Sequence, residues 1–501
     1  MMNNNILRKQ KCRELIEKRS ACTKVYENED HTMTAAIYGQ PVHYMKDGVW
    51  EEIDSRLTDG TEEEGDVENT AGSLKIRLSN QAKEKGMVRI GRGKAKLSWG
   101  LKGCATVKRQ AVDSAGTAGE GCEAMVVAHL ASKVCYPEIY PGVDLACTVR
   151  SDSVKEDIFL KGPEAPRRFV WHYQTGQLTA VQKEDAILFM EDDGREVYRL
   201  EAPYMTDAAG VRCTDVRLTA EPVEKGREAR ISLTVSDSWL TDEKRAWPVT
   251  IDPVVSTSQK VSDIRDCHVS SYYHTDNFYN SHMLKTGCVD GSVLRSYLKF
   301  ELPQIDRSAD MIISAWFHLV KYPGSGASKR TIDLHRVTGA WEERTITWDN
   351  QPASASAVVD YATFATTDQA TVSFDVTDLV RNWYTNGGNY GMMIRAHDES
   401  GNSTNYAEYL SSDCDEAYAA IRPCILISYV NYSGLEDHWS FHTQTIGRAG
   451  TVSVNDYNGN LVFIHDTLHM TGNRMPVALS HVYNSNDRLK DLGYGVVRQI
   501  K

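Results

Sequence analysis

Long hydrophobic runs are absent from this sequence, and their absence excludes a whole class of protein. No stretch approaches the roughly 20 apolar residues that a membrane-spanning helix needs, so no membrane span is expected. Basic blocks are also scarce, because 56 Lys and Arg stand against 68 Asp and Glu, for a formal net charge of −12. Nucleic-acid binding depends on clustered Lys and Arg, so no nucleic-acid partner is expected.

Cysteine pairs and catalytic signatures are missing as well. The 11 cysteines are odd in number and include no CxxC pair, which excludes a complete disulfide set and gives no zinc-ligand spacing. There is no HExxH, no GxSxG and no P-loop motif, the signatures of zinc proteases, serine hydrolases and P-loop NTPases. The sequence therefore predicts a protein that is not an enzyme, with no certain cofactor.

The sequence instead contains many short segments in which apolar and polar residues alternate, separated by Gly, Asp, Asn and Pro. In MIISAWFHLV (311–320), one face carries Ile313, Ala315, Phe317 and Leu319. Such period-two patterning is typical of antiparallel sheets with one buried face. The predicted fold class is all-β, with tandem antiparallel β-sandwich domains of the jelly-roll type.

Two short helices are expected beside the strands. The basic N-terminal stretch places Ile6, Leu7, Leu15 and Ile16 on roughly one side, which predicts a short helix and lacks the apolar core of a signal peptide. The second helix is expected within FDVTDLVRNWYTNGG (374–388), where two glycines end it.

The residue pattern places boundaries near residues 30 and 255, and the resemblance described below implies a third near residue 430. Residues 1–30 are the helical segment, residues 31–255 a β-rich N-terminal domain, residues 256–430 a second β-sandwich, and residues 431–501 a further β segment. The boundary near residue 255 lies in AWPVTIDPVVSTSQ (246–259), where two prolines end a strand and a Ser/Thr-rich tether follows.

Tryptophan beside carboxylate makes VTGAWEERTITWDNQP (337–352) the first candidate for sugar chemistry. The pattern predicts a strand, a short connection and a second strand. Neighbouring side chains of an extended chain point to opposite faces, so Glu342 and Glu343 cannot both flank one glycosidic bond, as a hydrolase requires. The same alternation separates Trp341 from Trp348. Structural packing, a sugar-stacking surface and catalysis are the three interpretations, in that order.

A polar, tyrosine-rich loop, HVSSYYHTDNFYNSH (268–282), offers two candidate metal sets. One consists of His268, His274 and His282. The other, suited to calcium through its oxygen atoms, consists of Asp276, Asn277 and Asn280. Asp and Asn are also the ordinary residues of turns, so a loop without metal is the alternative.

Several motifs occur along the second β-sandwich in a fixed order. They are VSDIRDCHVS, HTDNFYNSHMLKTG, RSYLKFELPQI, SAWFHLVKY, IDLHRVTGAWEERTITWDNQP, FDVTDLVRNWYTNGGNYGMMIRAHDES and RPCILISYV. In this order they resemble the DNRLRE family, grouped with carbohydrate-binding module family 96. The resemblance implies a jelly-roll-like sandwich that binds sugars, chiefly acidic polysaccharides, in secreted or cell-surface proteins.

The flanking motifs include AAIYGQPVHYMKDGVWEEIDSRL and WLTDEKRAWPVTIDP on one side and GLEDHWSFHTQTIGRAGTVSVNDYNGNLVFIHDTL on the other. They resemble the front of large bacterial wall-associated and RHS/YD-repeat proteins. This resemblance implies that residues 431–501 are the truncated start of an RHS/YD shell, with the remainder of the shell as a partner. It also implies an extracellular or cell-surface location, although no signal peptide is visible.

Binding a glycan needs exposed aromatic rings, which stack on sugar rings, and an acidic glycan such as a cell-wall polymer or polyuronate also needs a local basic cluster. The aromatic candidates are Tyr272, Tyr273, Trp341 and Tyr384. The basic candidates are Lys285, Arg295, Lys299, Arg336 and Arg344. The first hypothesis is thus a non-enzymatic surface protein with a polysaccharide-binding module. The alternatives are a structural spacer of a polymorphic toxin without a glycan ligand, and a glycan lyase or hydrolase.

Overall fold

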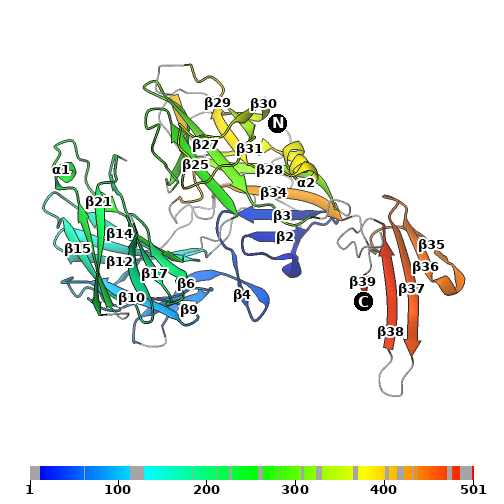
Figure 1. Cartoon of the computed structure of the whole chain (residues 1–501), viewed down its shortest axis with the longest axis horizontal. Helices are drawn as coiled ribbons and strands as arrows, with labels where there is room; N and C mark the ends of the chain where they lie inside the picture. Colours follow the sequence, from blue (N-terminus) through cyan, green and yellow to red (C-terminus); the bar gives the residue numbers. More distant parts are fainter. Residues whose placement is uncertain are drawn as a thin grey trace.

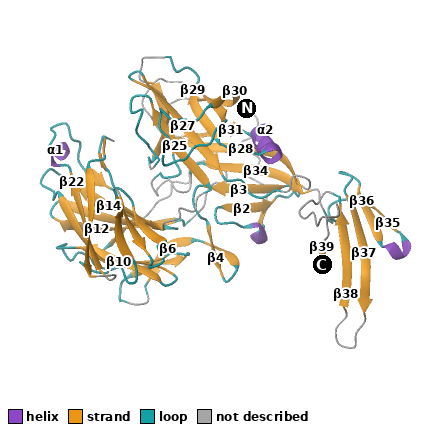
Figure 2. Cartoon of the chain, in the orientation of Figure 1, coloured by secondary structure: helices purple, strands orange, loops and turns teal. Residues whose placement is uncertain are grey.

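The computed structural model is built almost entirely of strands (Figure 2), which confirms the predicted all-β class. Its described helices are α1 (Asp237–Leu240), α2 (Thr377–Asn386) and the one-turn 3-10 helices Ile16–Lys18 and Gly447–Ala449. None of the described helices is long and apolar enough to cross a membrane. The structure describes residues 12–60, 63–112, 129–183, 185–209, 211–224, 228–257, 263–279, 281–305, 310–322, 330–364, 370–400, 405–414, 422–431, 434–435, 437–470, 477–485 and 499–500.

Figure 1 shows two large β bodies beside each other, here called the N-terminal sandwich and the module, and a smaller sheet at the C-terminal end. The N-terminal sandwich contains an eight-stranded sheet in the order β21-β22-β15-β10-β9-β8-β7-β6. Its strands are β6 (Asp54–Asp59), β7 (Val67–Ala71), β8 (Lys75–Leu78), β9 (Val88–Arg92), β10 (Ala95–Leu101), β15 (Arg168–Gln174), β21 (Val216–Glu224) and β22 (Glu228–Val235).

A second, 11-stranded sheet faces it across one shared core. Its strands are β11 (Gln110–Val112), β12 (Ala131–Tyr140), β13 (Val143–Arg150), β14 (Ser153–Leu160), β16 (Thr179–Lys183), β17 (Ala186–Met190), β18 (Glu196–Leu200), β19 (Met205–Asp207), β20 (Arg212–Cys213), β23 (Val249–Ile251) and β24 (Val254–Thr257). A separate hairpin is formed by β4 (His43–Lys46) and β5 (Val49–Glu52).

Strict alternation explains how the core of the N-terminal sandwich forms. In β15, Phe169, Trp171 and Tyr173 are buried, while the residues between them face outward. The same period brings Trp99 of β10 beside Tyr173, with ring centroids 5.3 Å apart. Burying each large side chain contributes roughly 1.5–3 kcal/mol, so alternating aromatic residues fix which face of the sheet is inside.

The module is a single 13-stranded antiparallel sheet that wraps around its own core. The strands are β1 (Arg13–Glu14), β2 (Thr23–Glu27), β3 (Met33–Tyr38), β25 (Ile264–Ser270), β26 (Met283–Val289), β27 (Ser292–Phe300), β28 (Asp310–Tyr322), β29 (Arg330–Val337), β30 (Ser354–Phe364), β31 (Ala370–Asp375), β32 (Met392–Ala396), β33 (Asn405–Leu410) and β34 (Cys424–Asn431).

The beginning of the chain belongs to this sheet. Strand β3 pairs with β34 along its whole length, and Val25, Ala35 and Ile37 are buried in the core of the module. The helix expected over residues 1–30 is absent from the described part, which forms β1, a single 3-10 turn and β2. The physical reason is that Ile16 is exposed while alternating residues of β2 are buried, so the strand period outweighs the helical one. Ile6 and Leu7 lie outside the described residues.

The helix expected after residue 376 is confirmed. Helix α2 buries Leu379, Val380 and Trp383 against the module. It ends at Gly387, whose φ of 71° lies in the left-handed region that glycine adopts without strain.

The C-terminal sheet is a meander of five strands in sequence order. They are β35 (Phe441–Thr445), β36 (Thr451–Asn455), β37 (Leu461–Met470), β38 (Val477–Asn484) and β39 (Gln499–Ile500). Val462 is the one hydrophobic side chain that is buried among those described in this sheet. His438, just before β35, stacks on His31 of the module with ring centroids 4.0 Å apart.

Candidate functional site

The outer face of the module's sheet carries the candidate site. Strands β25, β27, β32, β29 and β30 lie side by side in that order. Their alternation sends Leu298, Leu334 and Ile394 into the core, and the residues between them outward. Residues 338–353 cover part of this outer face and leave another part open. The side chains of the uncovered part and its border, here called the open strip, are Arg295, Asp333, Trp348, Tyr361, Arg395, His397 and Glu399.

Arg295 is held at the border of the open strip by three partners. Its guanidinium donates two hydrogen bonds to Glu399, both of 2.8 Å, and a third of 3.1 Å to Gln351 Oε1. It also lies over the indole ring of Trp348, 4.8 Å from the ring centroid, a cation–π geometry. The hydrogen bond to Glu399 raises the pKa of Arg295. These contacts fix Trp348 in one orientation while leaving it half-buried.

The opposite end of the open strip carries an imidazole and a phenol. His397 Nδ1 lies 2.9–3.0 Å from both carboxylate oxygens of Asp333. The Asp333 side chain is 4% exposed and the His397 side chain 67% exposed, so a buried carboxylate orients a solvent-facing ring. Tyr361, 64% exposed, sits opposite Asp333 on β30. Arg395 lies opposite Asp333 on the other side, on β32.

Arg395 joins the two ends of the open strip. Its Nε atom donates to His335 Nε2 at 3.1 Å, and its Nη1 atom lies 3.6 Å from Glu399. The open strip therefore presents aromatic faces at both ends and fixed donors and acceptors between them, with positive and negative groups balanced. This combination suits a ligand with many hydroxyl groups and apolar ring faces.

Residues 338–353 form turns and no strand, contrary to the expected strand–connection–strand. The reason is packing: Ile346 is buried, and half-buried Trp341 packs with it on Tyr297 and Met393 of the sheet. Trp341 Nε1 also donates to the carbonyl oxygen of Tyr390 at 2.8 Å. The aromatic pair thus divides into Trp341, which anchors the covering segment, and Trp348, which borders the open strip.

The two adjacent glutamates of this segment have different environments. Glu342 is exposed, whereas Glu343 is 6% exposed and accepts a hydrogen bond of 3.1 Å from the Asp266 backbone nitrogen. Glu343 therefore holds the covering segment to β25.

The predicted aromatic site residues do not share one surface. Tyr272 and Tyr273, 72% and 54% exposed, lie in the loop after β25 and contact each other edge to face. That loop reaches the covering segment through His274 and Asp349, 2.7 Å apart. Tyr384, on α2, packs against the core and donates to the Pro303 carbonyl oxygen at 2.6 Å.

The predicted basic cluster is also dispersed. Arg295 alone among these five belongs to the open strip. Lys285 pairs with Glu408 at 2.9 Å, and Lys299 lies 3.7 Å from Glu301. Arg344 pairs with Glu201 of the N-terminal sandwich at 3.2 Å. Arg336 is exposed opposite Met392, whose side chain is in the core.

The candidate calcium loop uses its polar groups for its own structure. Asn277 donates through Nδ2 to the carbonyl oxygens of Glu343 (2.9 Å) and Ile346 (2.7 Å), and its Oδ1 accepts from the Tyr279 nitrogen at 3.2 Å. Asp276 is exposed, and Asn280 lies outside the described residues.

The three histidines of the same loop have separate environments. Burial lowers the pKa of His268 to about 3, and its ring stacks on Phe278. His274 contacts Asp349. His282 lies 3.3 Å from the hydroxyl of Tyr204.

Two other groups of side chains have metal-like spacing. In Asp266, Glu343 and Asp413 the ligand atoms lie within 4.8 Å of one another. This all-oxygen donor set is of the type that calcium prefers. Asp266 Oδ2 also accepts from the Ser412 nitrogen at 2.7 Å, so the group ties the covering segment and the turn after β33 to β25.

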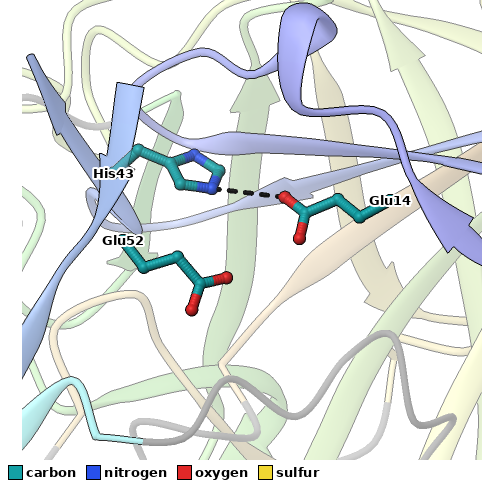
Figure 3. Close-up of side chains that lie close together, drawn as sticks. All are labelled: Glu14, His43 and Glu52. Atoms are coloured by element: carbon teal, nitrogen blue, oxygen red, sulfur yellow. Dashed lines mark ion pairs between the residues drawn. The ribbon is translucent and has the colours of Figure 1, made fainter. Parts of the chain in front are cut away.

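Figure 3 shows the second group, Glu14, His43 and Glu52, where strand β1 meets the β4–β5 hairpin. Burial by itself raises the pKa of Glu14, but hydrogen bonds from His43 and Arg19 and the charge of Lys24 bring it down to about 2. Lys24 also pairs with Glu52 at 2.6 Å. These cations already neutralise the carboxylates, so the group functions as an ion-pair cluster.

A cavity of about 130 Å³ lies between the N-terminal sandwich and the module. Lys155, Glu201 and Asp252 line it from one body, and His282, Arg344 and Asp413 from the other. Opposite charges lie close together here: Lys155 is 3.8 Å and His282 3.9 Å from Asp252. The cavity is thus a charged junction between the two bodies.

Sequence reasoning overlooked most of the open strip. Arg395 and His397 alternate in MMIRAHDES, as outward residues of a strand do, and that spacing was the available signal. Asp333 and Tyr361 lie on other strands, so their place beside Arg395 depends on strand order, which no local pattern contains.

Residues 257–418 match the model of carbohydrate-binding module family 96. The family describes a binding module, and the match covers the strands from β25 to β33, which include the open strip.

Among curated proteins, the chain is similar to the tRNA(Glu)-specific nuclease WapA of Bacillus subtilis subsp. natto (strain BEST195) and the tRNA nuclease WapA of Bacillus subtilis (strain 168). Each is 25% identical over 440 residues, covering 83% of this chain and 18% of the relative. It is also 27% identical over 201 residues to the Wall-associated protein of Geobacillus stearothermophilus, covering 39% of this chain and 75% of that protein. The chain thus spans less than a fifth of the length of the two nucleases. The family match points to carbohydrate binding, and the last relative is itself named as wall-associated.

Proposed function

We propose that this chain is a non-catalytic protein of the cell surface that binds polysaccharide through the open strip of its module. The observation that carries the proposal is the half-buried Trp348 ring, fixed over Arg295 at the border of a face that also bears exposed Tyr361 and His397. Rigid aromatic faces lose little entropy on binding, and fixed polar groups between them set the orientation of a sugar.

The surroundings of the open strip support binding over bond cleavage. Glycoside hydrolysis by the usual route needs two carboxyl groups about 5–9 Å apart across a cleft. In the open strip, Glu399 is engaged by Arg295 and Asp333 by His397. We therefore infer that the module holds its glycan without cleaving it, and that no reducing sugar is released.

The ligand is proposed to be a cell-wall polysaccharide, including acidic or polyuronate types. Arg395 is the group best placed to meet a sugar carboxylate, because its side chain is 33% exposed, its Nε atom donates to His335 and its Nη1 atom lies 3.6 Å from Glu399, beyond hydrogen-bond distance. Similarity to a protein named as wall-associated supports the surface location. Calcium binding by the loop at 276–280 stays a prediction.

A glycan array probed at low salt with the full chain tests the proposal. We expect binding to a subset of neutral or acidic polysaccharides, lowered at least about tenfold by Trp348→Ala, since stacking on one aromatic ring is worth roughly 1–3 kcal/mol. The matched control is Tyr457→Ala, which removes an exposed ring from the C-terminal sheet. A blank array for the wild-type chain, or equal losses in both variants, would remove the proposal.

The C-terminal sheet favours a second role beside the first. Its five strands form a single layer in which Val462 is the one described hydrophobic side chain that is buried. A lone meander of this kind gains little from burial. We propose that it is one wall of an RHS/YD-type shell and that the remainder of such a shell is its partner. Rapid hydrogen exchange across β35–β38 in this chain is expected, and strong cooperative protection there would argue against a missing partner.

A further inference from the structure

The solvent face of the eight-stranded sheet in the N-terminal sandwich is rich in cations. Figure 1 shows its strands β9, β10, β15 and β21 on the side of the molecule away from the C-terminal sheet. The inward residues of these strands, such as Leu97, Trp171 and Ile231, belong to the core. The outward positions therefore alternate with them and face water.

Several outward cations are already neutralised by nearby acids. Arg77 pairs with Glu68 at 2.6 Å, and Lys85 with Glu228 at 2.6 Å. Arg89 lies 3.2 Å from Asp66. Five others are exposed and form no ion pair within 4.0 Å in the described part of the chain, and one of them, Arg230, lies opposite Glu221. This group, here called the basic face, consists of Lys75, Lys96, Arg168, Arg217 and Arg230.

The pairing register sets the spacing within the basic face. Lys75 and Lys96 both lie opposite Gly91, one on each side of β9. Arg168 and Arg217 both lie opposite Thr234, one on each side of β22. Each pair is therefore two strands apart, about 10 Å. Charges at this spacing across a sheet match an extended chain of regularly repeated anions better than a single compact anion.

The described outward residues of this sheet include His172 but no Phe, Tyr or Trp. The large rings of these strands, Trp99, Phe169, Trp171 and Tyr173, are buried on the opposite side. Binding of single-stranded nucleic acid uses aromatic platforms for base stacking, and no Phe, Tyr or Trp platform is present among these outward residues. The chain as a whole has a net charge of −12, so the local excess of positive charge on this face is opposite in sign to the net charge of the chain.

We propose that the basic face docks a linear polyanion whose phosphate or carboxylate groups repeat along a flexible polyol or sugar backbone. Contact is through charge alone and is separate from glycan recognition by the open strip. Binding by clustered cations releases counterions, so its affinity falls steeply as salt rises.

The test measures binding of the full chain to poly(glycerol phosphate) and to polygalacturonate at about 50 and about 200 mM salt. The triple variant Lys75→Gln, Lys96→Gln, Arg230→Gln should bind at least about tenfold more weakly and lower the slope of log affinity against log salt by about two to three. Comparing the two polymers shows whether phosphate or carboxylate is preferred. The matched control, Lys183→Gln, Lys244→Gln, Arg448→Gln, removes three exposed charges elsewhere and should bind as the wild type does.

Three results would overturn the proposal. They are no salt-sensitive binding of either polymer by the wild-type chain, equal losses in the triple variant and its control, and tighter binding to a short DNA duplex than to either polymer. Trp348→Ala serves as the second readout: it should leave binding of poly(glycerol phosphate) unchanged, so failure here is distinguishable from failure of glycan binding by the open strip. Circular dichroism of each variant confirms that the fold is retained.

Discussion

At the scale of single residues, polar groups in this protein mostly fasten one segment to another. Asn277 joins the loop after β25 to the covering segment, and Glu343 joins that segment to β25. Buried polar groups of this kind are costly to leave without a partner, about 1–3 kcal/mol each. The residues that looked like ligands or catalysts in the sequence are therefore needed for the architecture that exposes Trp348.

Asn277→Asp separates the structural role of Asn277 from a calcium role. Aspartate keeps the size and the oxygen ligand but cannot donate to the carbonyls of Glu343 and Ile346. We expect the variant to lose about 2–4 kcal/mol of stability, measured by thermal unfolding, with no recovery when calcium is added. Unchanged stability, or stabilisation restored by calcium, would favour the metal-binding loop.

Glu156 should make the stability of the N-terminal sandwich depend on pH. It is 1% exposed, accepts a 3.0 Å hydrogen bond from Trp99 Nε1, and burial raises its pKa from 4.5 to about 7. The folded state therefore keeps a proton that the unfolded state releases, so this group's stabilising contribution is full below pH 4.5 and is lost as the pH rises to about 7. The largest loss of stability that this pKa shift can cause is about 3 kcal/mol.

Glu156→Gln should remove this dependence, because an amide does not titrate and still offers an oxygen to Trp99. Calorimetric unfolding should show that the free energy of unfolding of the variant, relative to that of the wild type, is higher at pH 8 than at pH 5 by up to about 3 kcal/mol. Parallel profiles for the two proteins would show that Glu156 is already ionised in the folded state.

At the scale of elements, the module depends on a strand from the far end of the chain. β3 lies between β2 and β34 and hydrogen-bonds to both. Ala36→Pro would remove a ladder donor from this internal strand and should cost about 3 kcal/mol or more. It should also speed amide exchange in β34.

Glu29→Pro is the matched control for that change. Residue 29 follows Asn28 in the turn closed by the hydrogen bond from His31 N to Asn28 O, a position where proline is favoured. Its stability should change little. Equal effects of the two substitutions would show that β3 is dispensable to the module.

The same strands show which features of the fold can be predicted from the sequence and which cannot. Period-two alternation correctly predicted the strand at 311–320 and the all-β class, because burial of one face is a local property of the chain. It was wrong for Ile313, which is 40% exposed because the register shifts between Ile312 and Ser314. It did not predict that Ala36 pairs with Leu426, since pairing over such a separation depends on the whole fold. The open strip was overlooked for the same reason: Arg295, Asp333 and Tyr361 come from three strands, and only their order in the sheet brings them together.

At the scale of the whole molecule, two surfaces of different chemistry lie on different bodies. In the open strip, Arg295 and Glu399 neutralise each other, so glycan binding there should depend only weakly on salt. The exposed cations of the basic face form no ion pair within 4.0 Å in the described part of the chain, so its binding should weaken steeply with salt. The junction of charged pairs such as Arg344 with Glu201 joins the two bodies.

The central claim is that a glycan lies on the open strip, and hydrogen exchange with and without a bound neutral polysaccharide tests it most directly. The account predicts added protection in the peptides that carry Trp348, Tyr361 and Arg395, with none in β8, β9 or β22 of the N-terminal sandwich. Protection confined to the junction cavity or to the loop of Tyr272, with no change along β29, β30 and β32, would contradict it.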